Sequence, residues 1–85
     1  DQRGCGAAHR RLRWRCRRGM LELDWLLQGF LDAGYAELGS AGQHAFEELL
    51  GLPDQDLLEY LMERHAPTDR EWAHVIAKIR RAAQA

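Results

Sequence analysis

Apolar residues recur along most of this chain with the period of an α-helix. The clearest stretch begins at Glu22 and Asp24, two acids that suit the positive end of a helix dipole. It ends at Gly34, a residue type typical of helix termination. Between them, apolar side chains are spaced three and four apart, as on the buried face of an amphipathic helix. These apolar positions are Leu23, Leu26, Leu27, Phe30 and Leu31.

Three more helices are predicted after this one. Ser40 and Gln43 have the spacing of a capping box, which predicts a helix that runs to about residue 51. Pro53 predicts the start of a fourth helix, and Thr68 with Glu71 forms a second capping box that opens a fifth. Their predicted core positions are Ala45, Phe46, Leu49 and Leu50, then Leu57, Leu58, Leu61 and Met62, and finally Trp72, Val75, Ile76 and Ile79.

The start of the chain adds one shorter helix. Ala8, Leu12 and Cys16 lie at intervals of four, so we expect a helix over residues 8–17 with these three side chains inward. Residues 1–7 contain two glycines and little to bury, and we expect them to form a disordered tail. No segment alternates with period two. The sequence therefore predicts an all-α fold, a single small bundle of about five short helices over residues 8–85.

Charge divides the chain into two unlike parts. Residues 1–18 hold seven arginines and one acid, whereas residues 19–63 hold ten acids and no Lys or Arg. One interpretation is that the cationic helix pairs with the acidic body. The other is a small nucleic-acid-binding or regulatory module, in which arginines neutralise phosphates and Trp14 stacks on a base. The acids would repel a phosphate backbone, so we favour the first and expect no nucleic acid partner.

Candidate catalytic and metal chemistry is sparse. The sequence has no nucleophile elbow, no phosphate-binding glycine loop and no close pair among its four histidines. Cys5 and Cys16 lack metal-ligand spacing with those histidines and do not form a disulfide scaffold. No run of about 18 apolar residues predicts a membrane span. We therefore expect a cytoplasmic protein that is not an enzyme and binds no metal.

Two features of the second helix region are ambiguous. Arg18, Gly19 and Glu22 make a compact charged junction, whose local explanation is a helix break at the glycine with an ion pair between residues four apart. Trp25 lies three residues after Glu22. We expect its indole to pack against the fourth or fifth helix, with a docking anchor for a partner as the alternative.

Two runs of residues carry a family resemblance. The first is Arg11-Leu12-x-Trp14-x-Cys16-x-Arg18-Gly19-Met20-Leu21-Glu22-Leu23-Asp24, and the second is Phe46-x-x-Leu49-Leu50 followed by Pro53-Asp54-x-Asp56-Leu57-Leu58-x-Tyr60-Leu61-Met62. Together with the chain length and helix order, they resemble the FAD assembly factors of succinate dehydrogenase, the SdhE family. About residues 9–80 take part in this resemblance.

The resemblance implies an assembly chaperone. Such a protein binds the flavoprotein subunit of succinate dehydrogenase or fumarate reductase and promotes covalent attachment of FAD to one of its histidines. FAD is then the client's cofactor, and none is bound tightly by the chaperone, which we expect to be a monomer. The implied partner-binding residues are Arg18, Gly19 and Glu22, flanked by Arg11, Trp14 and Arg17. A generic interaction domain stays open as a further alternative.

Overall fold

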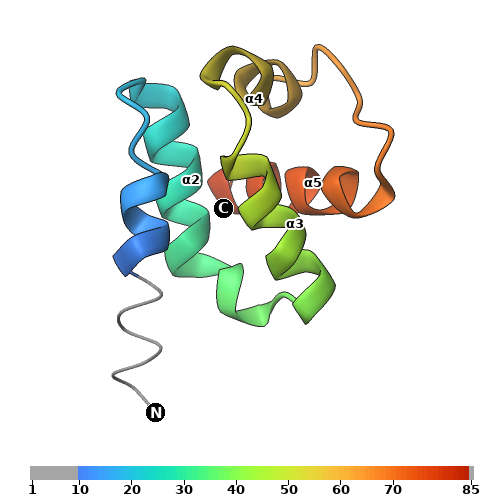
Figure 1. Ribbon diagram of the computed structural model, residues 1–85, viewed down its shortest axis with the longest axis horizontal. Helices are drawn as coiled ribbons and strands as arrows, with labels where there is room; N and C mark the ends of the chain where they lie inside the picture. Colours follow the sequence, from blue (N-terminus) through green and yellow to red (C-terminus); the bar gives the residue numbers. More distant parts are fainter. Residues whose placement is uncertain (1–9, 85) are drawn as a thin grey trace.

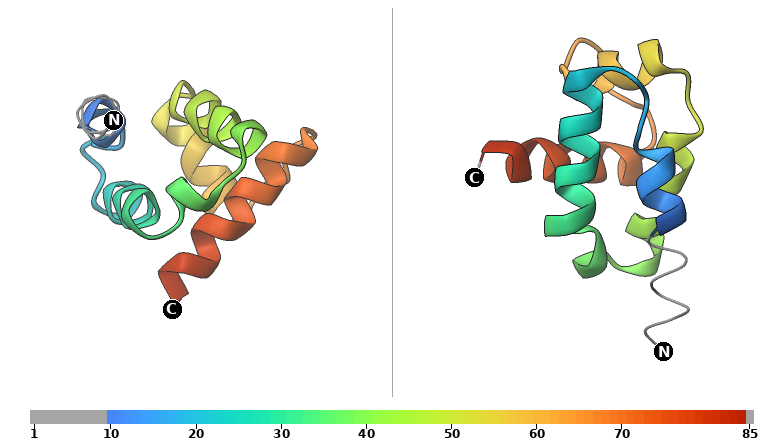
Figure 2. Two further views of the ribbon diagram at one scale, coloured as in Figure 1. Left: turned by 90° about the horizontal axis from the view of Figure 1, so that it is seen from below. Right: turned by 90° about the vertical axis from the view of Figure 1, so that its left-hand side faces the viewer.

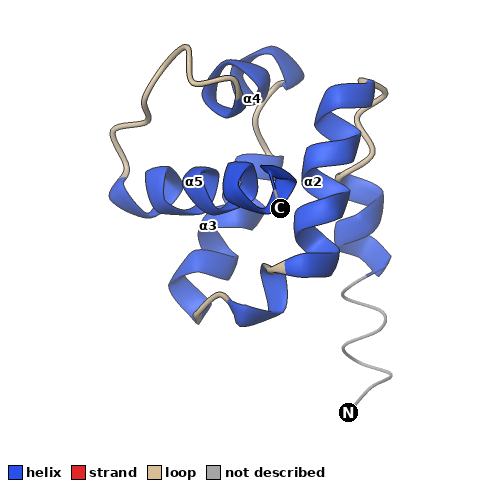
Figure 3. Cartoon of the chain, turned by 180° about the vertical axis from the view of Figure 1, so that it is seen from behind, coloured by secondary structure: helices blue, strands red, loops and turns tan. Residues whose placement is uncertain are grey.

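Helices make up nearly all of the regular structure in the computed structural model, which describes residues 10–84. Residues 10–15 are helical and are followed by α2 (Leu21–Ala33), the 3₁₀ helix η1 (Tyr35–Glu37), α3 (Ser40–Leu50), α4 (Asp54–Leu61) and α5 (Arg70–Gln84). No strand occurs among these residues (Figure 3). The predicted all-α bundle is confirmed. The predicted tail, with Cys5 and with Ala8 of the first helix, lies outside the described residues.

α5 is the element on which the bundle is assembled. It packs against both α2 and α3 and, less extensively, against α4. Its axis crosses those of α2 and α3 steeply (Figure 1). The helical residues 10–15 lie alongside α2 on the side away from α5 (Figure 2). This arrangement leaves one long face of α2 free of any neighbouring helix.

The core is formed by the apolar faces that the spacing predicts. All five predicted positions of α2 are buried, each no more than 7% exposed. Phe46 of α3 is fully buried and contacts two aromatic rings, with centroids 5.6 Å from Phe30 and 5.3 Å from Tyr35. α4 begins directly after Pro53, as predicted. Most other predicted core positions of α3, α4 and α5 are also buried, whereas Leu58, Met62 and Trp72 are half-buried.

Both predicted capping boxes are wrong. Ser40 is the first residue of α3 and makes no capping hydrogen bond, since Gly39 occupies the N-cap; the Gln43 side chain instead donates to the carbonyl of Tyr35 at 3.2 Å. At α5, the carboxylate of Asp69 accepts hydrogen bonds from the backbone N–H groups of residues 71 and 72, at 2.8 and 3.1 Å. A carboxylate carries negative charge to the helix N-terminus, so Asp69 caps this helix better than the predicted Thr68.

The predicted core role of Trp25 is also wrong, because its indole is 63% exposed. The buried stripe of α2 is centred on Leu23, Leu27 and Phe30, and residue 25 lies on the other side of that helix. The large indole that does help to close the bundle is Trp72. It packs edge-on against Tyr60 with centroids 6.3 Å apart, and its Nε1 donates to Glu48 at 3.0 Å.

Candidate partner-binding site

The chain turns sharply at Gly19, between the helical residues 10–15 and α2. The φ of Gly19 is +82°, in the left-handed region where a side chain strains the backbone. A Cβ built on this residue would meet nothing within 4 Å. The need for glycine is therefore set by the backbone, and the space outside the turn is open to an approaching partner. The predicted helix break at Gly19 is confirmed.

Asp24 holds the turn from its α2 side. The backbone N–H of Arg18 donates to Asp24 Oδ1 at 2.6 Å, and the N–H of Asp24 donates to the carbonyl of Met20 at 2.8 Å. The carboxylate lies in the first turn of α2, where the helix dipole favours a negative charge. One acidic residue thus joins the two sides of the glycine turn.

The side chain of Arg18 is directed into its own molecule. It is 14% exposed, and its Nε lies 2.6 Å from Asp54 Oδ1 at the start of α4. Its terminal nitrogens donate to the carbonyl of Leu50, at 2.6 Å, and to that of Leu52. Leu50 is the last residue of α3 and Leu52 follows it, in a region where helix carbonyls lack partners within the helix. Arg18 therefore fixes the glycine turn to the connection between α3 and α4.

Glu22 has the opposite environment. It lies exposed in the first turn of α2, and within residues 10–84 it makes no hydrogen bond or ion pair. The ion pair between Glu22 and Arg18, which the local explanation assumes, is not formed because no helix runs through Gly19. The carboxylate is consequently available to a partner while its backbone belongs to a packed helix.

The flanking residues add an apolar and cationic surface. Arg11, Trp14 and Arg17 are all exposed, Trp14 to 70%. The guanidinium carbon of Arg17 lies 5.4 Å from the centre of the Trp14 ring, within the range of a cation–π contact. Leu21, at the start of α2, is 87% exposed. Trp14 and Leu21 are therefore two large apolar side chains, one before Gly19 and one at the start of α2, that could contribute apolar area to a partner interface.

The other arginines of the first segment support pairing with the acidic body. Arg13 forms an ion pair with Asp32 of α2, and Arg15 donates to the carbonyl of Glu47 in α3 at 3.0 Å. With Arg18 bound to Asp54, three cations are used within the molecule. This arrangement weakens the nucleic-acid hypothesis, which needs those charges to face phosphates.

Other chemistry is limited in the described part of the chain. Residues 10–84 contain no group of His, Cys, Asp and Glu that could hold a metal ion. None of their helices has the length and apolar character needed to cross a membrane. Cys16 is fully buried, and burial raises the pKa of its thiol to about 11. Its sulfur is therefore a protonated core group at neutral pH.

Two residues of this site were not identified as such from the sequence. Asp24 was interpreted only as a charge near a helix N-terminus, and Asp54 was named only within the second run of the resemblance; both lie in the first turn of a helix. Their additional role is to bind Arg18, from six and 36 residues away. A signal for the first was present, because an acid in the first turn of a helix can accept a hydrogen bond from a backbone N–H group that precedes the helix. No local pattern signals the second.

Comparison with known proteins gives consistent matches over this region. A family model described as "Flavinator of succinate dehydrogenase" matches residues 10–83. The FAD assembly factor SdhE of Idiomarina loihiensis is 45% identical over 67 residues, which cover 79% of this chain and 74% of that protein. The protein of the same name from Coxiella burnetii is 39% identical over 72 residues, or 85% of this chain and 88% of its own. The FAD assembly factor SdhE of Pseudomonas aeruginosa is 40% identical over 70 residues, which cover 82% of this chain and 83% of that protein.

Proposed function

Because the chain belongs to the family of succinate dehydrogenase flavinators, we propose that it is an assembly chaperone for a flavoprotein. Its client is the flavoprotein subunit of succinate dehydrogenase, or that of fumarate reductase, and it promotes covalent attachment of FAD to a histidine of that subunit. FAD remains the client's cofactor. The chaperone acts as a monomer in the cytoplasm and is not itself an enzyme, a proposal that fits the scarcity of catalytic groups in its sequence.

The observation that carries this proposal is the exposed carboxylate of Glu22, which has no partner among residues 10–84, beside a turn that is held from both sides. Forming a bond between flavin and histidine requires a held cofactor and an aligned client loop. A rigid domain can supply that alignment through binding energy without donating chemical groups. Glu22 then binds a basic or amide group of the client by a charge-assisted hydrogen bond.

The other predicted partner-binding residues take distinct roles in this proposal. Gly19 lets the client approach the turn closely, because no side chain projects there. Arg11, Trp14 and Arg17 supply the surrounding contact area. Arg18 acts as a positioning residue, since its donors already bind Asp54 and two carbonyl groups.

Glu22→Gln tests the proposal. The substitution removes the charge and keeps the shape, and a surface acid near a helix N-terminus contributes only about 0.3–1 kcal/mol, so the domain should stay folded. Client flavinylation, measured as covalent flavin fluorescence on the purified apo-subunit with added FAD, should fall at least about tenfold, the loss of about 1.4 kcal/mol of binding.

Glu37→Gln is the matched control, because Glu37 is an exposed acid of η1 away from the turn. It should leave flavinylation unchanged. Full activity of the Glu22 variant would contradict the assigned role of that carboxylate. A parent protein that neither binds the apo-subunit nor raises its flavinylation would refute the function itself.

A further inference from the structure

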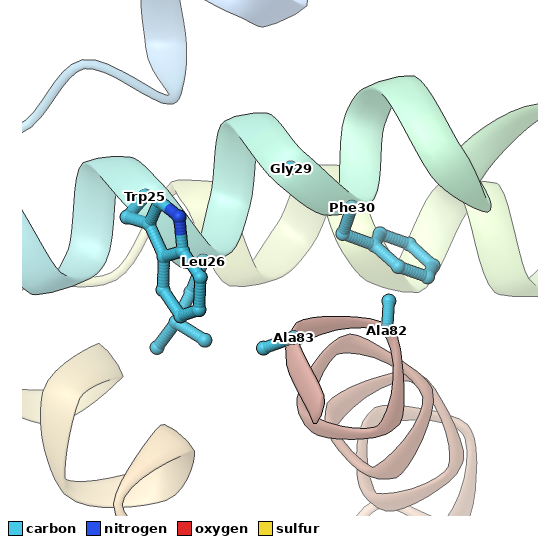
Figure 4. Close-up of a pocket in the computed structure, with 6 residues that line it drawn as sticks. All are labelled: Trp25, Leu26, Gly29, Phe30, Ala82 and Ala83. Atoms are coloured by element: carbon cyan, nitrogen blue, oxygen red, sulfur yellow. The ribbon is translucent and has the colours of Figure 1, made fainter. Parts of the chain in front are cut away.

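A hollow lies at the seam between α2 and the end of α5. Its volume is about 210 Å³. Four lining residues come from α2 and two from the last turns of α5, namely Trp25, Leu26, Gly29, Phe30, Ala82 and Ala83. Figure 4 shows the indole of Trp25 at one end of the hollow and the Phe30 ring at the other, with the alanine methyl groups facing them across the seam.

The hollow stays open because its middle is lined by small residues. Gly29 contributes no side chain, and a Cβ built on it would meet nothing within 4 Å. The residues opposite extend only as far as a methyl group. A helix-interior glycine is unfavourable for helix stability, so its presence here needs a reason other than folding. Space for an incoming side chain is such a reason.

The exposed indole of Trp25 adds to this interpretation. It is 63% exposed, although its ring borders a hollow lined by apolar side chains that it does not fill. Indoles that keep one side in water and one side on an apolar surface are frequent anchors in protein interfaces. A partner that entered the hollow would remove this apolar surface from water.

The hollow lies on the same flank of α2 as Glu22 of the candidate partner-binding site. Counting from Glu22, Trp25, Leu26 and Gly29 lie three, four and seven residues further along α2. This spacing places them on one flank of the helix. Seven residues correspond to an axial rise of about 10 Å. The available carboxylate and the apolar hollow can therefore be reached by one short segment of a partner.

The charges of α2 indicate which partner fits. This helix carries the acids Glu22, Asp24 and Asp32 and no basic residue. Asp32 pairs with Arg13 and Asp24 accepts from the N–H of Arg18, so Glu22 is the acid that this flank offers to a partner. Two copies that met through this flank of α2 in a symmetric dimer would bring Glu22 no basic residue of that helix to bind. A client segment that presents an apolar side chain and a basic or amide side chain is complementary to it.

We propose that Glu22 and this hollow form a two-point docking site for the client flavoprotein. An apolar client side chain seats between Trp25 and the end of α5, while a cationic or amide side chain about one to two helical turns away binds Glu22. The proposal rests on the proposed function and adds to it the site that recognises the client by its apolar side chain.

Gly29→Leu tests the docking site by filling the hollow from within a helix. Removing a glycine from α2 should leave the melting temperature equal or higher. Binding of the purified apo-flavoprotein subunit, measured by titration calorimetry, should weaken at least about tenfold. Ala77→Leu is the matched control, since it adds the same side chain to an exposed position of α5 outside the hollow. It should leave the affinity unchanged.

Trp25→Ala provides a second variant that removes a wall of the hollow. It should also weaken binding about tenfold while melting close to the parent. If both variants are folded and bind the client as the parent does, the docking site is refuted and the chaperone function stands. If the parent protein does not bind the client, the proposed chaperone function is refuted, and the docking site with it. A parent that dimerises, with a dimer lost in Gly29→Leu, would assign the hollow to self-association and overturn the proposal.

Discussion

Arg18→Ala should act on the fold of this protein before it acts on any partner. The substitution removes the ion pair with Asp54 and the hydrogen bonds to the carbonyls of Leu50 and Leu52. The side chain is only 14% exposed, so water cannot simply replace it in the folded state. The expected consequence is a loose contact between the glycine turn and the connection from α3 to α4.

The magnitude follows from the individual contacts. A hydrogen bond with a charged partner contributes about 1.5–3 kcal/mol, and a carbonyl left without a partner costs about 1–3 kcal/mol. These contributions do not add fully, and the carboxylate of Asp54 is 40% exposed and can be rehydrated. We expect a loss of about 3 kcal/mol in the free energy of unfolding. For a domain of this size, such a loss lowers the melting temperature by about 12–24 °C.

Thermal and urea unfolding followed by far-ultraviolet circular dichroism measure this effect. Arg17→Ala is the matched control, because it removes the same charge one residue earlier from an exposed side chain. Its contact with Trp14 is exposed and contributes only about 0.5–1 kcal/mol. Arg18→Lys should lie between the parent and Arg18→Ala, since an ammonium group cannot reach several acceptors with the geometry of a guanidinium group.

One result would refute this reasoning. Arg18→Ala could melt within about 2 °C of the parent, well below the shift expected for a 3 kcal/mol loss, while client binding falls at least about tenfold. Arg18 would then be a direct client contact, as the family resemblance implies, and its contacts within the chain would contribute little. A large loss of stability with intact affinity of the folded fraction would support the positioning role.

Two more predictions follow from the backbone and the core. Gly19→Ala and Gly19→Arg should each cost about 1–2 kcal/mol of stability, because both place a side chain at positive φ without a clash. Titration calorimetry on the two folded variants should show a much larger loss of client affinity for Gly19→Arg than for Gly19→Ala. Equal affinities would contradict the close approach of the client to the turn. Burial raises the pKa of Cys16 from 9.0 to about 11, so the unfolded chain loses this proton first as the pH rises. Stability from this thiol should be complete below pH 9 and be lost between pH 9 and 11, by an amount on the order of 3 kcal/mol. Urea unfolding across this range should show a smaller decline for Cys16→Ala, and an identical decline would contradict the buried thiol as its source.

Much of the secondary structure could be predicted because each helix has its apolar residues spaced three and four apart within one short stretch of sequence. The spacing of Leu23, Leu27 and Phe30 identifies the buried face of α2 with no knowledge of what covers it. The helix ends were harder, because several residues that could cap a helix stand side by side. At α5 the competition between Thr68 and Asp69 was decided by a carboxylate that fits two N–H groups.

The candidate site was predicted only in part, for a related reason. Glycine at position 19 and an acid at position 22 could be recognised from residues close together in sequence. The role of Arg18 could not, because its acceptors lie 32 to 36 residues further along the chain. Which of its possible partners it meets depends on how α3 and α4 are joined and packed.

Sequence alone thus determined the helices, their buried faces and the glycine turn, since each follows from the 3.6-residue period or from the φ of one residue. Tertiary structure decided which side chains remain for a partner. Trp25 illustrates both parts: its place opposite the buried stripe of α2 leaves its indole exposed, whereas the hollow beside it exists only because Ala82 and Ala83 of α5 lie against this helix. Whether a side chain is buried depends on the surface that packs against it as well as on its own helix, and the sequence of one helix does not specify that second surface.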